Sequence, residues 1–124
     1  MGIRILGTGS FVPERVVENE EFTKFVDTSD EWIVKHSGIK RRRLHDGANF
    51  EMAAAAAERA LESAGLSPLD LDLILCTTVS SDYATPSLAC VVQGKIGAKN
   101  ALAMDLNAAC AGFVFGLDAA RLYL

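Results

Sequence analysis

The 124-residue sequence has few cysteines, no long hydrophobic run and no excess of positive charge. Its three cysteines, Cys76, Cys90 and Cys110, form no CxxC pair, so neither a disulfide framework nor a zinc site is indicated. No run of about 18 to 20 apolar residues is present, which argues against a membrane-spanning helix. Twelve basic against sixteen acidic residues give a net charge of −4, which argues against a protein that coats nucleic acid.

The composition is that of a folded domain. Half of the residues are apolar and 23% are charged, enough to bury a core and unlike a disordered segment. The length allows one domain of ordinary size and excludes two full ones. Residues 1–6 contain no extended hydrophobic signal region, so we expect a cytoplasmic location.

Segments typical of strands and helices alternate along the chain. Apolar or β-branched runs predict strands over residues 3–6, 73–78 and 101–106. Helical spacing and capping residues predict helices that begin at Asn19 and Thr28, and others over 49–64, 88–96 and 113–124. This alternation predicts an α/β fold with a largely parallel sheet covered by helices.

Two threonines are predicted N-caps. Thr28 precedes Glu31 by three residues, which matches a capping box for a helix that ends at Gly38. Thr85 precedes Pro86, and proline is favoured at the first helical position, so Thr85 is expected to cap the helix over 88–96.

Positive charge is concentrated in residues 35–43, which hold five bases and no acid. The run over 40–43 has two readings, a solvated edge or a phosphate contact, and the pattern leaves both open. Its position next to the helix that carries Trp32 favours phosphate contact.

Cys110 lies in the turn between the strand over 101–106 and the last predicted helix. A helix N-terminus favours a thiolate, and the small neighbours Ala109 and Ala111 leave room for an acyl group and for backbone N–H groups that hold an oxyanion. Cys110 is therefore the candidate nucleophile, with simple packing as the alternative. Cys76 and Cys90 have apolar neighbours and are expected to be buried and unreactive.

Three segments together resemble a known enzyme family. Residues 5–10 read Ile-Leu-Gly-Thr-Gly-Ser, residues 27–33 read Asp-Thr-Ser-Asp-Glu-Trp-Ile, and residues 105–113 read Asp-Leu-Asn-Ala-Ala-Cys-Ala-Gly-Phe. In this order they are similar to 3-oxoacyl-[acyl-carrier-protein] synthase III, a thiolase-like condensing enzyme. The resemblance implies a thiolase-like α/β fold in which residues 1–124 form the N-terminal part of the first of two similar halves.

The resemblance also implies an activity. Cys110 would take an acyl group from acyl-coenzyme A and pass it to the carbanion formed when malonyl-acyl-carrier protein loses carbon dioxide, the reaction that initiates fatty-acid synthesis. The implied protein is a homodimer with no metal, no cofactor besides acyl-coenzyme A as substrate, and no nucleic-acid or membrane partner. The family's catalytic His and Asn match neither His36 nor His45 and are expected outside this chain.

Four further residues receive roles from the resemblance. Trp32 matches the position that stacks on the adenine of coenzyme A, with core packing as the alternative. Thr28 belongs to the same motif and would line the nucleotide site, and His36 stands there where the family commonly has Arg, so a fixed positive charge is missing. Thr85 matches the residue that closes the acyl pocket, and its small size predicts that acyl groups longer than acetyl are accepted.

Alternative functions remain open. A related synthase that starts a polyketide or quinolone pathway would share the Cys110 turn. A non-catalytic fragment, or a partner subunit of another chain, would share the sequence without the activity. The chain ends inside its last predicted helix with no terminating Gly, Asn or Pro, so we expect a truncated sequence that folds poorly and is inactive alone.

Overall fold

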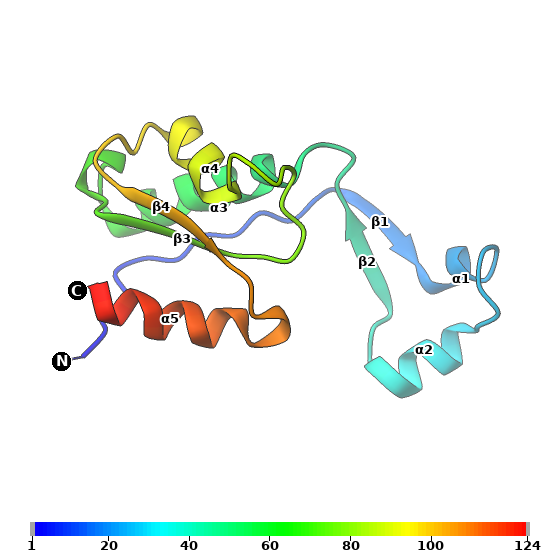
Figure 1. The fold of residues 1–124 in the computed structure, drawn as a ribbon. Coiled ribbons are helices and arrows are strands. Elements are labelled where there is room, and N and C mark those ends of the chain that lie inside the picture. Colours follow the sequence, from blue (N-terminus) through cyan, green and yellow to red (C-terminus); the bar gives the residue numbers. More distant parts are fainter. Residues whose placement is uncertain (1, 124) are drawn as a thin grey trace. The chain divides into compact units, whose positions relative to one another are not determined.

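The computed structural model describes residues 2–123 and divides into two compact units (Figure 1). The larger unit contains the residues up to Phe11 and those from Ala48 onward, and the smaller unit is Val12–Gly47. Among residues 2–123, no helix is both long and apolar enough to cross a membrane.

A pair of parallel strands forms the centre of the larger unit. Strand β3 (Leu73–Thr77) pairs with β4 (Leu102–Leu106), in register from Leu73 opposite Leu102 to Thr77 opposite Leu106. Parallel neighbours need a crossover connection, which here contains the helix α4 (Leu88–Ile96). Figure 1 shows α3 (Asn49–Ala64) and α4 over one face of the strands and α5 (Gly112–Tyr123) against the other. The predicted α/β class is confirmed.

The core of the larger unit lies where α3 and α4 meet the strands. Its buried residues are mostly small or aliphatic: Ala54, Leu61, Leu88, Val92, Ile96, Ala98 and Ala101. The partly buried side chains of Ile74 and Cys76, from β3, pack against this cluster. The alanines along α3 allow close contact with the segment that contains Gly7, where an added Cβ would lie 2.6 Å from the Ala60 carbonyl oxygen.

The smaller unit is a two-stranded antiparallel sheet with two helices between its strands, and this strand pair is called the hairpin below. Strand β1 (Arg15–Glu18) pairs antiparallel with β2 (Arg41–Leu44), and α1 (Asn19–Phe22) and α2 (Asp30–Ser37) lie between them in the sequence. Asn19 is fully buried there.

The buried amide of Asn19 is satisfied by hydrogen bonds to three parts of the smaller unit. Its Nδ2 donates to Asp30 Oδ1 at 2.7 Å and to the Ile39 carbonyl oxygen at 2.8 Å, and its Oδ1 accepts from Arg42 Nη1 at 2.6 Å. The Arg42 guanidinium also lies 4.5 Å from the centre of the Phe22 ring. A buried polar group satisfied in this way fixes a single arrangement of the two helices and the hairpin.

Residues 3–6 do not form the predicted strand. No strand of residues 2–123 pairs with them, and the segment that follows lies against α3 instead. A Cβ at Gly7 would lie 2.6 Å from the Ala60 carbonyl oxygen, and one at Gly9 would overlap the backbone of Ala56. An apolar pattern predicts an extended chain, but only hydrogen bonds to a neighbour make a strand. The resulting sheet has two strands rather than the predicted three.

Three predicted N-cap residues are wrong by one or two positions, although the helix over 88–96 has its predicted bounds. Ser29 caps α2 by accepting from the Trp32 N–H, and Ser87 caps α4 by accepting from the Cys90 N–H, in place of Thr28 and Thr85. Helix α1 is capped at Glu18 rather than Asn19, which turns inward, and ends at Phe22. Each predicted cap stands within two residues of another capping residue, so composition alone does not select between them.

Candidate active site around Cys110

Cys110 lies in a 3-10 turn, η2 (Ala109–Ala111), between the end of β4 and the first residue of α5. Its side chain is exposed, as a nucleophile requires. The preceding residue, Ala109, has φ of 45°, a left-handed conformation that strains a residue with a Cβ by about 1–3 kcal/mol. The structure thus places Cys110 on the predicted strand-to-helix turn. The strain of that turn was not predicted.

The position of α5, and so of Cys110, is set by contacts between two glycines and Thr77. A Cβ at Gly112 would lie 3.2 Å from Thr77 Cβ, and one at Gly116 would lie 2.6 Å from Thr77 Cγ2. Only glycine at 116 allows this approach. The start of α5 therefore rests directly on the carboxyl end of β3.

Asp105, near the end of β4, joins this strand to the start of α4. Its Oδ2 accepts from the Leu88 N–H at 2.8 Å and from Ser81 Oγ at 2.9 Å, while its Oδ1 accepts from the Ala89 N–H at 2.8 Å. In the sequence, Asp105 stands out only as part of the motif over 105–113. An acid at the end of an otherwise apolar strand was the signal for this structural role.

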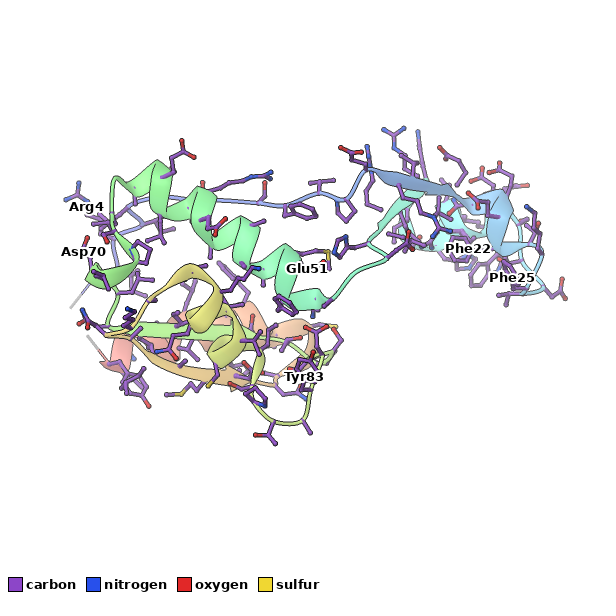
Figure 2. All side chains as sticks on the ribbon, turned by 90° about the horizontal axis from the view of Figure 1, so that it is seen from above. Arg4, Phe22, Phe25, Glu51, Asp70 and Tyr83 are labelled. Atoms are coloured by element: carbon purple, nitrogen blue, oxygen red, sulfur yellow. The ribbon has the colours of Figure 1, made fainter. Side chains whose placement is uncertain are left out.

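Asp82 likewise accepts hydrogen bonds from the first backbone N–H groups of α3. Its carboxylate accepts from the backbone N–H groups of Asn49 at 2.6 Å and Phe50 at 2.8 Å. Asp82 and Tyr83, the latter labelled in Figure 2, belong to the loop between β3 and α4. A hollow of about 420 Å³ at this loop is lined by residues that include Tyr83, Asp105 and Asn107. It lies at the carboxyl ends of the two parallel strands, a common place for ligands in α/β folds.

The three thiols have different surroundings. Cys76 is half-buried, and burial together with the nearby charge of Asp105 raises its pKa from 9.0 to about 11. Cys90 is exposed, which contradicts the expected burial, because α4 buries Leu88, Ala89 and Val92 and leaves position 90 off that face. Its Sγ lies 3.8 Å from the Ala103 carbonyl oxygen.

Thr85 is exposed in the loop before α4 and does not cap the helix. The Thr85–Pro86 peptide bond is cis. Thr85 is not among the residues that line the hollow at this loop. Its assignment to an acyl pocket remains a prediction.

Trp32 and His36 lie together on α2, in the smaller unit. The Trp32 side chain is 57% exposed and is not part of the core of the described residues. Its assignment to adenine stacking stays a prediction. The centres of the two rings are 4.2 Å apart and the ring planes meet at 26°, a stacked pair. The Thr28 hydroxyl oxygen is buried and has no hydrogen-bond partner, so it faces inward and not toward solvent.

The basic run over 40–43 is divided between structural and exposed side chains. Arg42 bonds to Asn19, and Arg43 Nη1 donates to the carbonyl oxygens of Pro13 at 3.3 Å and Glu14 at 3.2 Å. Lys40 and Arg41 are exposed. The hairpin thus uses half of the run for its own structure.

The predicted site residues fall into two groups. Cys110 and Thr85 belong to the larger unit, whereas Thr28, Trp32 and His36 belong to the smaller one. Within residues 2–123, no three side chains of His, Cys, Asp or Glu gather as metal ligands would.

Comparison with known proteins shows which enzymes the chain resembles. The chain is 52% identical over 123 residues to β-ketoacyl-[acyl-carrier-protein] synthase III of Clostridium acetobutylicum, a match that covers 98% of this chain. It superimposes on the crystal structure of 3-oxoacyl-[acyl-carrier-protein] synthase III from Aquifex aeolicus with a TM-score of 0.93 and 45% identity over 98% of this chain. Over nearly its whole length, the chain is similar to a part of β-ketoacyl-[acyl-carrier-protein] synthase III proteins.

Three further findings bear on this similarity. The priming β-ketosynthase of the R1128 polyketide pathway also matches, with a TM-score of 0.88 and 41% identity over 94% of this chain. No family model matches the chain. The chain spans 38% of the Clostridium synthase III, 40% of the Aquifex one and 36% of the priming ketosynthase. The predicted resemblance to synthase III and its thiolase-like fold are confirmed for this portion.

Proposed function

We propose that the protein is an acyltransferase that condenses acyl-coenzyme A with malonyl-acyl-carrier protein to give 3-oxoacyl-acyl-carrier protein. The exposed Cys110, held on a strained turn at the start of α5, carries the proposal. The identity of about half to synthase III proteins supports the same reaction. A homodimer and a cytoplasmic location belong to the proposal and stay predictions.

The reaction has two stages. The Cys110 thiolate attacks the thioester carbonyl, an enzyme thioester forms, and the coenzyme A thiolate leaves and takes up a proton. Decarboxylation of the malonyl group then breaks a C–C bond, and the resulting carbanion attacks the enzyme thioester. A new C–C bond forms and Cys110 is released as thiolate.

The described residues supply the nucleophile and donors for the developing oxyanion. The first N–H groups of an α-helix have no partner within the helix, and those of α5 follow Cys110 directly. They are suited to stabilise negative charge on the thioester oxygen. The family's His and Asn, expected outside these residues, would stabilise the carbanion.

The nucleotide end of coenzyme A is assigned to the smaller unit. The exposed Trp32 ring on α2 offers a flat surface for adenine, and Lys40 and Arg41 carry positive charge on the same unit. Stacking of a base on an aromatic side chain contributes roughly 1–3 kcal/mol.

Labelling of the full-length protein with radioactive acetyl-coenzyme A tests the proposal. We expect one acetyl group per chain, located at Cys110 by mass mapping and lost in Cys110→Ser. The matched control is Cys90→Ser, which changes the other exposed thiol and should label normally. A protein that takes no label, or that keeps it in Cys110→Ser, is not this enzyme, and the reading as a non-catalytic fragment or partner subunit then gains support.

The similarity to a polyketide priming ketosynthase supports a second candidate function. Both candidates form the Cys110 thioester, so they differ in the acyl donor and the carrier protein that accepts it. Competition between acetyl- and longer acyl-coenzyme A, with the carrier protein of fatty-acid synthesis as acceptor, separates them. Turnover with acetyl-coenzyme A and that carrier favours the first candidate.

A further inference from the structure

The face of α2 that carries Trp32 also carries His36, and the two side chains form one unit. Residues four apart are neighbours on a helix surface, and here their rings stack with centres 4.2 Å apart. The imidazole therefore covers one face of the indole. Trp32 is still 57% exposed, so solvent reaches the residue outside this contact.

A hydrogen bond to the main chain holds the imidazole in this place. His36 Nδ1 lies 2.7 Å from the Trp32 carbonyl oxygen. A carbonyl oxygen can only accept, so Nδ1 carries the hydrogen and donates it. The ring of His36 is thus fixed by the backbone of the residue on which it stacks.

We propose that His36 is a positioning residue that fixes the orientation of the Trp32 indole and blocks one of its faces, so that a purine base stacks on the opposite face only. The proposal rests on the nucleotide-binding role proposed above for Trp32. An exposed indole without this neighbour would sample several rotamers, and ordering it on binding would cost affinity. A ring held in advance by His36 avoids this cost.

Adenosine is the probe for the experiment, because it is uncharged and its binding does not depend on changes of charge near the helix. Quenching of Trp32 fluorescence gives the dissociation constant. Trp32 is the single tryptophan of these 124 residues, and in the full-length protein its emission is obtained by subtracting that of Trp32→Phe. Fluorescence anisotropy of the free protein reports how freely the indole moves.

Three variants separate the positioning role from general effects. His36→Ala removes the stack, His36→Phe keeps an aromatic layer without the Nδ1 hydrogen bond, and Lys35→Ala changes an exposed neighbour outside the pair. We expect His36→Ala to weaken adenosine binding roughly tenfold and to lower the Trp32 anisotropy. His36→Phe should recover most of the adenosine affinity and most of the Trp32 anisotropy. Lys35→Ala should have the affinity and anisotropy of the unmodified protein.

The outcomes distinguish the two proposals. If adenosine quenches Trp32 equally in the unmodified protein and in His36→Ala, with equal anisotropy, the positioning role is wrong while the nucleotide role of Trp32 stands. If adenosine does not quench Trp32 in the unmodified protein, the nucleotide role fails and the positioning role falls with it.

Discussion

The reactivity of the three thiols is decided at the scale of single residues. Cys110 and Cys90 are exposed, whereas burial and the charge of Asp105 raise the pKa of Cys76 to about 11. Cys110 alone precedes the N-terminus of a helix on a strained turn. Exposure and a helix N-terminus together mark reactive cysteines.

We expect Cys110 to react with iodoacetamide near pH 7 roughly tenfold faster than Cys90, with Cys76 unreactive. Mass-mapped alkylation over time measures the three rates in one sample of folded protein. Cys110→Ser should leave the rate at Cys90 unchanged. Equal labelling of Cys90 and Cys110 would remove the special reactivity of the turn.

The raised pKa of Cys76 also predicts how stability depends on pH. The unfolded thiol ionises near its ordinary value of 9.0 and the folded one only near 11, so between these values the unfolded state binds fewer protons. The contribution of Cys76 to the free energy of unfolding is complete below pH 9 and falls as pH rises toward 11. Urea unfolding at several pH values measures this effect. The difference in free energy of unfolding between the unmodified protein and Cys76→Ala should fall between pH 9 and 11.

Thr85→Phe tests the predicted acyl pocket. If Thr85 forms an open end wall, the larger ring should lower kcat/KM for long acyl donors and leave acetyl transfer nearly unchanged, since each buried CH₂ contributes about 0.8 kcal/mol. Thr85→Ser, which stays small, is the control. Identical donor profiles for the unmodified protein and both variants would place Thr85 away from the pocket.

At the scale of elements, regular patterns are predicted well and local choices are not. The continuous apolar runs that became β3 and β4 and the Ala-rich α3 each carry a clear compositional signal, and the structure has them within a residue or two. The β1–β2 hairpin was missed because β2 (Arg41–Leu44) consists mainly of charged residues, and such a run is typical of a solvated loop. Its order comes from Arg42 and Arg43, which bond to distant residues that no local pattern reveals.

The site shows the same division. Cys110 could be located from the strand before it and the helix after it, since an apolar run predicts the strand and helical spacing predicts the helix. The helix starts that Asp105 and Asp82 bind could not be predicted, because each lies far from its aspartate in the sequence, even though an acid in the apolar run of β4 marks Asp105 as unusual. The stack of Trp32 on His36 depends on side-chain rotamers, which spacing allows but does not dictate.

The contact of α5 with β3 predicts that a larger residue at position 116 is destabilising. Gly116→Ala would place a methyl group against Thr77 Cγ2, a distance of 2.6 Å that requires a shift of the helix and with it of Cys110. We expect a loss of about 1–3 kcal/mol in stability and a slower acylation of Cys110. Chemical denaturation and the labelling assay measure the two effects.

The source of this strain can be checked by a second substitution. Thr77→Ser removes Cγ2, so Gly116→Ala combined with Thr77→Ser should recover most of the loss. Gly94→Ala, on α4, adds a methyl group that meets no atom within 4 Å and should not destabilise the protein. If Gly116→Ala is as harmless as Gly94→Ala, the contact with Thr77 does not position α5.

For the molecule as a whole, the described residues leave many large apolar side chains exposed, several of them on α5. Phe113, Val114, Phe115 and Leu122 of α5 are each more than half exposed. Both sheets of the described residues have only two strands, so each strand has an edge whose backbone groups lack a partner strand. Patches and edges of this kind mark surfaces that associate with other protein.

The 124 residues expressed alone should therefore aggregate or need a partner chain, because association covers the exposed apolar side chains of α5 and the open edges of the strands. Light scattering after size-exclusion chromatography measures the association, and a thermal melt followed by circular dichroism measures the cooperativity. Phe113→Lys combined with Leu122→Lys should reduce aggregation, since both side chains are exposed and a lysine there meets solvent. The same change at Val92, which is buried, should instead unfold the chain. If the unmodified chain is a monodisperse monomer that melts cooperatively, the α3–α4 core suffices for stability. The exposed apolar side chains of α5 would then need another explanation.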